Sequence, residues 1–502
     1  MTHKPLLPLL LLSFILVACS EKQELPQGEP PVITWRMTAA RFTCYQGEVL
    51  SIVPDVLNTD EASQWTWTMD GQVVSREDHC TFEASQPGEF FIQLLVTNRY
   101  GEARDEVKIT VQEKKEELVD DVPPNDSVAA WHWPFTELNI PLGRSINLKP
   151  YMVQNIDAQS AQWFINGQPA AEKGLSLEFT GLEEGPVELV LQANGTLPAP
   201  EGEPQTISQT IHLNVCPEAG TYRRTSTAGS STLVNRVYEY QPAPGHQVNG
   251  YIVINSERLN FPRGCTHEQA CDTVLSHLRQ GLMISLGGCG GYLIAGFDHS
   301  MPVSKDGSYD LFIKSNPFSY QSEPGIVWVS QDVNGDGLPN DLWYELAGSE
   351  YGTDRETTGY ALTYFRPSRP GSAVVWRDQE GAQDVIPYMS YWNPQPYYWQ
   401  DWQTGRELTF CLSRLRSNFT YEHGISDIKP YPWGYADNLG ETDMDPGDAR
   451  RVCFRLSNAR TWDGHPANLE YIDFVKVQTA ETGWTPNLGD ISTEVYKIEG
   501  RK

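Results

Sequence analysis

Short stretches of alternating hydrophobic and polar residues dominate the chain, and turn residues separate them at short intervals. This period of two is the pattern of strands that bury one face. A helical period appears at His267–Gln280, which opens with a capping box formed by Thr266 and Gln269. The apolar stripe of this segment consists of Ala270, Val274, Leu275 and Leu278. The pattern predicts an all-β protein with one short helix.

A repeat with a period of 96 residues, the separation of Trp35 from Trp131, relates two early segments. The other matched pairs are Gly47 with Gly143, Pro54 with Pro150, Trp67 with Trp163, Gly71 with Gly167 and Gln72 with Gln168. Each copy has an Asx-Gly pair that suits a two-residue hairpin turn with positive φ at both positions. We expect two small β-sandwiches with Trp67 and Trp163 in their cores.

After Cys216 the chain continues with strand patterns but without a third copy of the repeat. Predicted strands are Tyr251–Asn255, Leu282–Leu286, Tyr292–Phe297, Tyr309–Ile313, Ile326–Val329, Tyr360–Phe365, Ala373–Trp376, Leu408–Cys411, Val452–Leu456 and Ile472–Gln478. Many short strands with one helix predict a larger jelly-roll-like β-sandwich. The expected organisation is a signal peptide over 1–18, an acidic linker over 19–31, immunoglobulin-like domains over 32–113 and 127–216 with a linker over 114–126, and a C-terminal domain over 217–500.

The N-terminus combines Lys4 with an apolar run, Leu9–Ala18, that ends directly before Cys19. This arrangement resembles the lipobox of bacterial lipoproteins, in which the signal peptide is removed and the cysteine carries the lipid. The run is too short to span a bilayer. The resemblance implies that Cys19 anchors the protein to the outer membrane, with the remainder exposed at the cell surface and held to the membrane by lipid alone.

The net charge and the cysteine content limit the partners and metal sites that the protein can have. A formal net charge of −28 excludes a nucleic-acid partner, because the phosphate backbone requires a basic surface. Eight cysteines remain after Cys19, without a CxxC pair, which argues against a zinc site. An even number outside the cytoplasm permits disulfides, and Cys44 with Cys80 in one small domain is the expected pair.

The clearest metal motif is Asp332–Asp341, with the sequence DVNGDGLPND. Side-chain oxygens at loop positions 1, 3 and 5 and a glycine at position 6 match a Ca²⁺ loop. The expected ligands are Asp332, Asn334, Asp336, the carbonyl of Leu338 and the side chain of Asn340. Trp343 at position 12 excludes a helix-loop-helix EF-hand, and the flanks read as strands. We expect structural Ca²⁺; the alternative is a metal-free hairpin rich in Asx residues.

Aromatic residues gather in two proline-interrupted stretches, 388–402 and 431–435. Prolines prevent a regular helix or strand there, and exposed rings offer a large contact area at a small cost in entropy. The alternative is that the rings pack over the open end of the sandwich. The expected ligand-binding residues are Tyr391, Trp392, Tyr397, Tyr398, Trp399, Trp402, Trp433 and Tyr435.

Catalytic motifs are missing from the sequence: there is no GxSxG elbow, HExxH motif or P-loop. Gly287–Gly291 leads from one predicted strand into another, so we interpret it as a tight turn. Asp298 and His299 at a strand end are interpreted as a hydrogen-bonded structural pair. We therefore expect a protein that is not an enzyme, with a glycoside hydrolase as the least favoured alternative.

Two resemblances add to this reading. The repeats resemble PKD-type immunoglobulin-like domains in Trp67-x-x-Asp70-Gly71 and in Gly88–Phe90, which implies spacers. The C-terminal block resembles a family of surface lipoproteins from gut anaerobes. The segments that carry this resemblance are Ser285–Gly288, Gly291–Tyr292, Gly296–Ser300, Asn316–Phe318, Ser322–Val327, Asp341–Glu350 and Ile472–Val477.

The second resemblance implies a ligand, because members of that family often accompany TonB-dependent transporters of corrinoids such as vitamin B12. It implies capture of a corrinoid, with the transporter as a partner. A carbohydrate is the second candidate, since Trp and Tyr rings also stack on sugars. A purely structural or adhesive protein acting through its PKD-type domains is the third.

Overall fold

A computed structural model of the chain describes residues 28–35, 40–113, 128–197, 205–248, 261–369, 371–388, 399–422, 425–485 and 489–501. Cys19, the predicted signal peptide and the whole predicted linker over 114–126 lie outside these residues. Within the described part of the chain, no helix combines the length and apolarity needed to cross a membrane. Contacts divide the chain into two compact units, of which one belongs to the first sandwich and the other contains Val111–Lys502.

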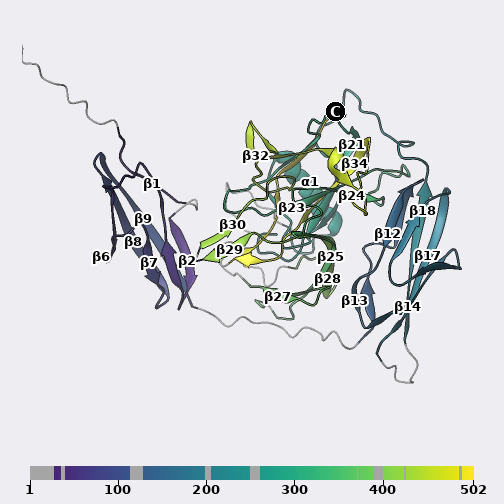
Figure 1. The fold of residues 1–502 in the computed structure, drawn as a ribbon, viewed down its shortest axis with the longest axis horizontal. Helices are drawn as coiled ribbons and strands as arrows, with labels where there is room; N and C mark the ends of the chain where they lie inside the picture. Colours follow the sequence, from purple (N-terminus) through teal and green to yellow (C-terminus); the bar gives the residue numbers. More distant parts are fainter. Residues whose placement is uncertain are drawn as a thin grey trace, which may run out of the picture. The chain divides into compact units, whose positions relative to one another are not determined.

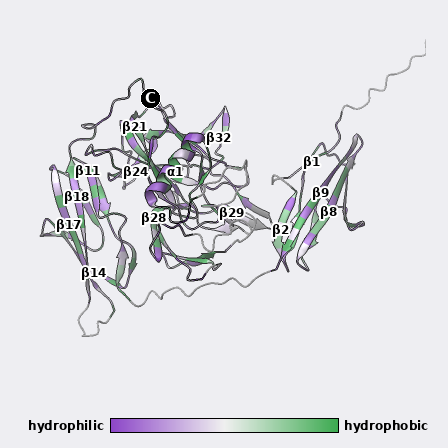
Figure 2. Ribbon diagram, turned by 180° about the vertical axis from the view of Figure 1, so that it is seen from behind, coloured by the Kyte–Doolittle hydropathy of each residue, from purple (hydrophilic) through white to green (hydrophobic). Residues whose placement is uncertain are grey.

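The first sandwich is built from three sheets (Figure 1). Its five-stranded sheet has the order β2 (Arg41–Tyr45), β9 (Gly101–Gln112), β8 (Gly88–Asn98), β5 (Gln64–Met69) and β6 (Gln72–Ser75). Two-stranded sheets join β3 (Val49–Ile52) to β7 (Cys80–Glu83) and β1 (Val32–Thr34) to β4 (Asp55–Leu57). Hydrophobic and hydrophilic positions are interspersed along β8 and β9 (Figure 2), as a strand with one buried face requires.

The second sandwich repeats this topology strand for strand. Its five-stranded sheet has the order β11 (Glu137–Pro141), β18 (Thr206–Cys216), β17 (Gly185–Gly195), β14 (Ile156–Ile165) and β15 (Gln168–Lys173). The remaining pairs are β12 (Ser145–Leu148) with β16 (Leu177–Thr180) and β10 (Ala130–His132) with β13 (Tyr151–Gln154). The predicted repeat is confirmed, and the edge strand β11 runs parallel to β18.

Both repeated sequence features have the expected structural role. Trp67 and Trp163 are completely buried in the cores of their sandwiches. The hairpin β5–β6 turns through Asp70 and Gly71, whose φ angles are 51° and 77°. The hairpin β14–β15 turns through Asn166 and Gly167, with φ angles of 48° and 76°. These are the two-residue turns with both φ angles positive that the Asx-Gly pairs predicted.

Three sheets form most of the C-terminal domain, which is all-β with one helix as predicted. The largest has the order β19 (Arg236–Gln241), β21 (Tyr292–Pro302), β34 (Tyr471–Thr479), β23 (Gly325–Ser330), β24 (Trp343–Leu346) and β33 (Ala459–Arg460). A second sheet consists of β31 (Met444–Asp445), β32 (Asp448–Phe454), β22 (Leu311–Lys314) and β38 (Lys497–Gly500). The third consists of β27 (Gln383–Ile386), β26 (Val374–Asp378), β25 (Glu356–Phe365) and β28 (Glu407–Leu415).

Smaller elements complete the domain. The short pairs are β20 (Ile284–Ser285) with β37 (Glu494–Val495), β29 (Phe419–Glu422) with β30 (Ile425–Ile428), and β35 (Trp484–Thr485) with β36 (Gly489–Asp490). A 3₁₀ turn, η1, spans Leu456–Asn458. The helix α1 spans His267–Gln280, and both hydrogen bonds of the predicted capping box are present. The predicted strand Tyr251–Asn255 lies outside the described residues.

The six-stranded sheet is covered on both faces. Val475 and Val477 of β34 point into a core shared with α1 and with the sheet of β22, β32 and β38. On the opposite face, the Gln478 side chain donates a hydrogen bond to the carbonyl of Cys411 on β28, at 3.3 Å. Because both faces of the sheet are buried, β34 reads as a nearly continuous buried strand rather than an alternating one.

The expected disulfide is not present. Cys44 on β2 and Cys80 on β7 are both buried, and each carries a free thiol. Burial raises the pKa of each thiol to about 11, so both behave as small apolar core residues. The even cysteine count was compatible with a bridge, but it could not show how the two sulfurs are oriented.

Candidate functional site

The loop between β23 and β24 folds as a compact series of Asx turns. Asp332 accepts hydrogen bonds from the amides of Gly335 at 2.8 Å and Gly337 at 3.0 Å. Asn334 accepts from the amide of Asp336 at 3.0 Å, and Asp336 accepts from the amide of Leu338 at 2.7 Å. Gly335 has a φ of 76°, and a Cβ there would lie 2.7 Å from the Tyr222 ring. A glycine is therefore required at this turn.

Asp341 is the buried member of the loop, and the ligand set expected from the sequence did not contain it. Its side chain has no solvent exposure, and its Oδ1 accepts from the amide of Val333 at 3.3 Å. Its Oδ2 has no hydrogen-bond partner. Burial, followed by the charges of Asp332 and Asp336, raises the pKa of Asp341 to about 8. A buried carboxylate oxygen without a donor is the kind of group that a cation would satisfy.

Asp473, on the neighbouring strand β34, fixes the start of the loop. Its Oδ2 accepts from the amide of Asp332 at 2.9 Å. Its Oδ1 accepts from Ser300 at 2.6 Å and from the guanidinium of Arg224 at 2.8 Å. Asp473 thus already has a cationic partner, whereas Asp332, Asp336 and Asp341 have no lysine or arginine ion pair among the described contacts.

One of the expected calcium ligands, Asn340, is placed differently from the prediction. The side-chain oxygen of Asn340 accepts from Asn139 of the second sandwich at 2.9 Å, so it points away from the loop. The Asn340 amide nitrogen donates to Asp336 at 3.0 Å. Leu338 is exposed, and its backbone amide is bound to Asp336. Asp332, Asp336 and Asp341 offer the carboxylate oxygens that Ca²⁺ prefers, but they are not among the described groups whose ligand oxygens lie within 4.8 Å of one another, so Ca²⁺ binding at this loop stays a prediction.

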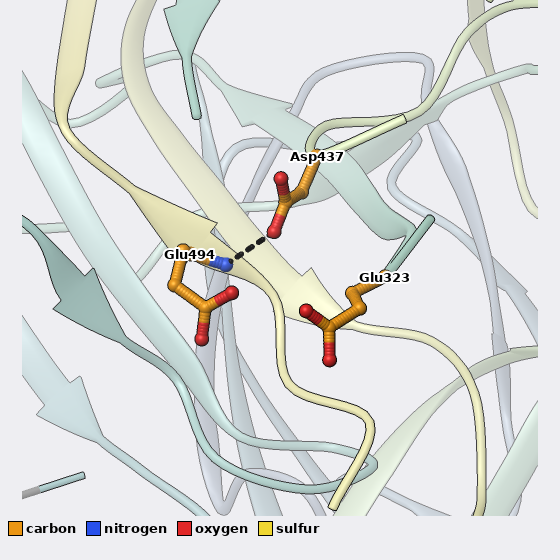
Figure 3. A group of neighbouring side chains, drawn as sticks. All are labelled: Glu323, Asp437 and Glu494. Carbon is orange, nitrogen blue, oxygen red and sulfur yellow. Dashed lines mark hydrogen bonds between the residues drawn. The ribbon is translucent and has the colours of Figure 1, made fainter. Parts of the chain in front are cut away.

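A second acidic group lies fully inside the C-terminal domain (Figure 3). Glu323, Asp437 and Glu494 come from three distant parts of the sequence, and one oxygen of each lies within 4.8 Å of those of the others. Asp437 accepts from the amides of Asn316 at 3.1 Å and Glu494 at 2.8 Å. Glu323 accepts from the amide of Ser492 at 3.1 Å. No motif in the sequence points to this cluster, because its members are far apart along the chain.

The pKa values of the three carboxyl groups indicate how they can lie so close together inside the domain. Burial raises the pKa of Asp437 to about 7 and raises the pKa values of Glu323 and Glu494 well above their ordinary range. The neighbouring Glu494 carboxyl opposes this rise in the pKa values of Glu323 and Asp437. A protonated Glu494 that shares its proton with its neighbours accounts for these directions. The same three carboxyl oxygens also lie close enough together to hold a cation.

The expected aromatic surface is partly wrong. Trp399 is 5% exposed and belongs to the core formed by β25, β26 and β28. Tyr435 is 1% exposed, and its hydroxyl accepts from the amide of Glu350 at 3.0 Å. Gly434, with a φ of 95°, turns the chain so that Tyr435 packs against Tyr431. Both rings are core residues because the proline-interrupted stretches return to the interior, which their composition could not reveal.

The other expected ligand-binding residues are either partly buried or outside the described residues. Trp402 is partly buried and packs against Phe261, with ring centroids 5.0 Å apart. Trp433 is partly exposed and lines a small pocket with Tyr309, Asp443 and Arg455. Tyr391, Trp392, Tyr397 and Tyr398 lie outside the described residues. The residues flanking that segment, Tyr388 and Trp399, both pack in the same core.

The two features interpreted as structural are confirmed. His299 is buried, and its ring nitrogen hydrogen-bonds to Asp298 at 2.7 Å. Gly287–Gly291 forms a turn between β20 and β21, and the amide of Gly291 donates to the carbonyl of Gly288 at 3.1 Å. A Cβ at Gly287 would lie 2.1 Å from the carbonyl oxygen of Ala243, so the turn depends on close backbone packing.

Comparisons with known proteins address the first sandwich. Residues 30–98 match the profile of the PKD-like domain family. No curated protein gives a match to the chain. Similar solved structures include the fibronectin(III)-like modules of Clostridium thermocellum CbhA, with 8% identity, 37% of this chain and 94% of that chain covered, and a TM-score of 0.15.

Two further solved structures are similar at the same level. Titin domains z1z2 in complex with telethonin share 13% identity over 38% of this chain and 98% of that chain, with a TM-score of 0.15. The insect immune protein hemolin shares 13% identity over 38% of this chain and 48% of that chain, with a TM-score of 0.15. From the profile match and the strand order together, the first domain is PKD-like and immunoglobulin-like.

Proposed function

We propose that this chain is a lipid-anchored, non-enzymatic binding protein of the cell surface, whose C-terminal domain captures a corrinoid for a TonB-dependent transporter. One observation carries the proposal. Tyr388 and Trp399, the described residues on either side of the aromatic stretch, pack in a single hydrophobic core. The folded domain therefore fixes the two points between which this stretch runs.

The residues that follow the aromatic stretch also pack against aromatic rings of the domain. Trp402 packs on Phe261 and lies 6.1 Å, centroid to centroid, from the buried ring of Tyr240. The amide of Gly264 donates to Asp401 at 2.5 Å, and Gln403 donates to the carbonyl of Pro242 at 2.8 Å. These contacts hold the chain after the aromatic stretch rigidly against the domain. We assign ligand binding to Tyr391, Trp392, Tyr397 and Tyr398. Trp399 and Tyr435 are no longer assigned to ligand binding, because both are buried.

A structural or adhesive protein is the second candidate, and the PKD-like first domain favours it. Under that alternative the binding surface lies in the sandwiches, and residues 217–502 are not needed for it. A carbohydrate ligand would use the same aromatic side chains as a corrinoid. The lipid anchor at Cys19 and the transporter partner belong to this proposal as well.

Titration with cyanocobalamin and with a glycan panel tests the proposal on the full mature chain. We expect cyanocobalamin to bind and the double variant Tyr391→Ala/Trp392→Ala to bind at least about tenfold more weakly, since aromatic anchors typically contribute 1 kcal/mol or more each. Phe91→Ala is the control, because Phe91 is a 44% exposed ring in the first sandwich. Binding to glycans without binding to cyanocobalamin would contradict the corrinoid assignment.

A further inference from the structure

Lys476 lies on a strand face that a second sheet covers. It belongs to β34, the third of six strands, and its neighbours Val475 and Val477 point into the core on the opposite face. On the side of Lys476, the side chain of Gln478 donates to the carbonyl of Cys411 on β28 at 3.3 Å. The sheet of β25 and β28 therefore covers the face that carries Lys476. Lysine seldom lies on a covered face without a negative partner, because burying an unpaired charge is costly.

Two aromatic rings flank the amine of Lys476. Its Nζ lies 4.6 Å from the ring centroid of Tyr292 and 5.7 Å from that of Trp328. Tyr292 is on β21 and Trp328 is on β23, the two strands that pair with β34. The indole nitrogen of Trp328 is buried and has no acceptor among the described residues. All three residues keep part of their surface exposed, so small molecules in solution have access to this group of side chains.

The acidic residues in register with Lys476 are bound elsewhere. Glu239 on β19 and Glu345 on β24 lie on the same face, each two strands away from β34. Glu239 pairs with His267 at 3.2 Å, and Glu345 accepts from Ser413 at 2.5 Å. Among the residues that the structure describes, no carboxylate forms an ion pair with Lys476. The amine therefore has aromatic neighbours instead of a counter-ion.

These surroundings leave a large share of the amine unprotonated. Burial lowers the pKa of Lys476 to about 8. The Cys411 thiol and the Tyr292 hydroxyl beside it are neutral at neutral pH, because burial raises the pKa of Cys411 to about 12 and raises the pKa of Tyr292 as well. Lys149 of the second sandwich, the other charged group that acts on Cys411, is positive and does not stabilise a second ammonium.

We propose that Lys476 is a nucleophilic amine that captures a small aldehyde or ketone as an imine. The amine nitrogen attacks the carbonyl carbon, a C=N bond replaces the C=O bond, and the oxygen leaves as water with two protons from the nitrogen. No oxidant or reductant is required. A desolvated, neutral amine is the form in which lysine acts as a nucleophile. Tyr292 and Trp328 contact the apolar part of the captured molecule. The inference does not depend on the ligand of the aromatic stretch.

Reductive trapping on the full mature chain tests the amine. Benzaldehyde and sodium cyanoborohydride at neutral pH convert an imine into a stable secondary amine, which peptide mass spectrometry assigns to a residue. We expect Lys476 to be modified at least about tenfold faster than the exposed Lys305, because a pKa of about 8 leaves far more neutral amine than the ordinary value of about 10.4. Lys476→Arg keeps the positive charge and should remove this adduct alone. Modification of Lys476 no faster than that of Lys305 would overturn the proposal.

A second comparison separates a reactive amine from a binding site. Trp328→Ala should slow trapping of benzaldehyde at Lys476 by about fivefold or more, since aromatic side chains are typical anchors for a bound molecule. Trp462→Ala is the matched control, because Trp462 is a 43% exposed tryptophan of the same domain. Formaldehyde should also be trapped at Lys476, but with little effect of Trp328→Ala. Trapping of formaldehyde without trapping of benzaldehyde would show that the site has no room for a ligand, and the capture role would be wrong.

Discussion

Replacing Glu494 by glutamine tests the shared-proton interpretation of the buried carboxyl cluster. The Glu494 carboxyl lies beside those of Glu323 and Asp437, and burial raises its pKa well above the ordinary value of 4.5. At neutral pH the folded protein must keep this group protonated, while the unfolded chain releases the proton. A glutamine amide supplies two N–H donors in place of the single O–H, so Glu494→Gln should satisfy both neighbours without a bound proton.

The sign and size of the effect follow from linkage. A raised pKa in the folded state means that the folded chain binds more protons than the unfolded chain, so stability falls as pH rises above about 4. At pH 7.5 the solution is about three units above the ordinary value, and each unit is worth about 1.4 kcal/mol. Glu494→Gln should therefore stabilise the C-terminal domain by up to about 4 kcal/mol at pH 7.5 and by nearly nothing at pH 4.5.

Thermal unfolding of the wild type and the variant at these two pH values provides the assay. Asp437→Asn is the matched control, because both Asp437 oxygens accept backbone amides and an amide nitrogen there would face a donor. That variant should be less stable at both pH values. An equal shift for Glu494→Gln at pH 4.5 and 7.5 would refute the reasoning. Destabilisation at pH 7.5 that disappears with EDTA would indicate a bound cation instead.

Four further outcomes are expected. Trp67→Ala should lower the stability of the first sandwich by about 3–5 kcal/mol in denaturant unfolding, since the side chain is fully buried; an effect below 1 kcal/mol would be inconsistent with a core role. Gly167→Ala should cost about 1 kcal/mol through its φ of 76° alone, because a Cβ there meets no atom within 4 Å. Ca²⁺ at a hundred times its dissociation constant should raise stability by about 2.7 kcal/mol, measured as a higher melting temperature than in EDTA; an identical melt would argue against the loop site. Cys19→Ser should move the protein from the membrane fraction to the soluble fraction, and retention in the membrane would disprove the lipid anchor.

Local rules predicted the repeated part of the fold well. A tryptophan three residues before an Asx-Gly pair was enough to place a core residue and a hairpin turn in each sandwich, because both features are fixed within a few residues of sequence. The capping box of α1 is local in the same sense. The sequence therefore predicted correctly the class of the fold and the elements whose geometry depends on near neighbours.

Features that depend on distant contacts could not be predicted in this way. Glu323, Asp437 and Glu494 meet because two loops and the strand β37 converge, and no spacing in the sequence encodes that. Trp399 and Tyr435 looked like surface residues by composition, yet the path of the backbone returns both to the core. The burial of Asp341 depends on contacts with segments outside the loop, which the spacing of polar residues in the loop does not encode.

The most direct test of the proposed function is co-elution of cyanocobalamin with the full mature chain on a gel-filtration column, followed by its visible absorbance. The account predicts a coloured protein peak, and a much weaker one for the variant Tyr391→Ala/Trp392→Ala. A colourless protein peak at cyanocobalamin concentrations well above micromolar, from protein that unfolds cooperatively, would contradict the proposed capture of a corrinoid.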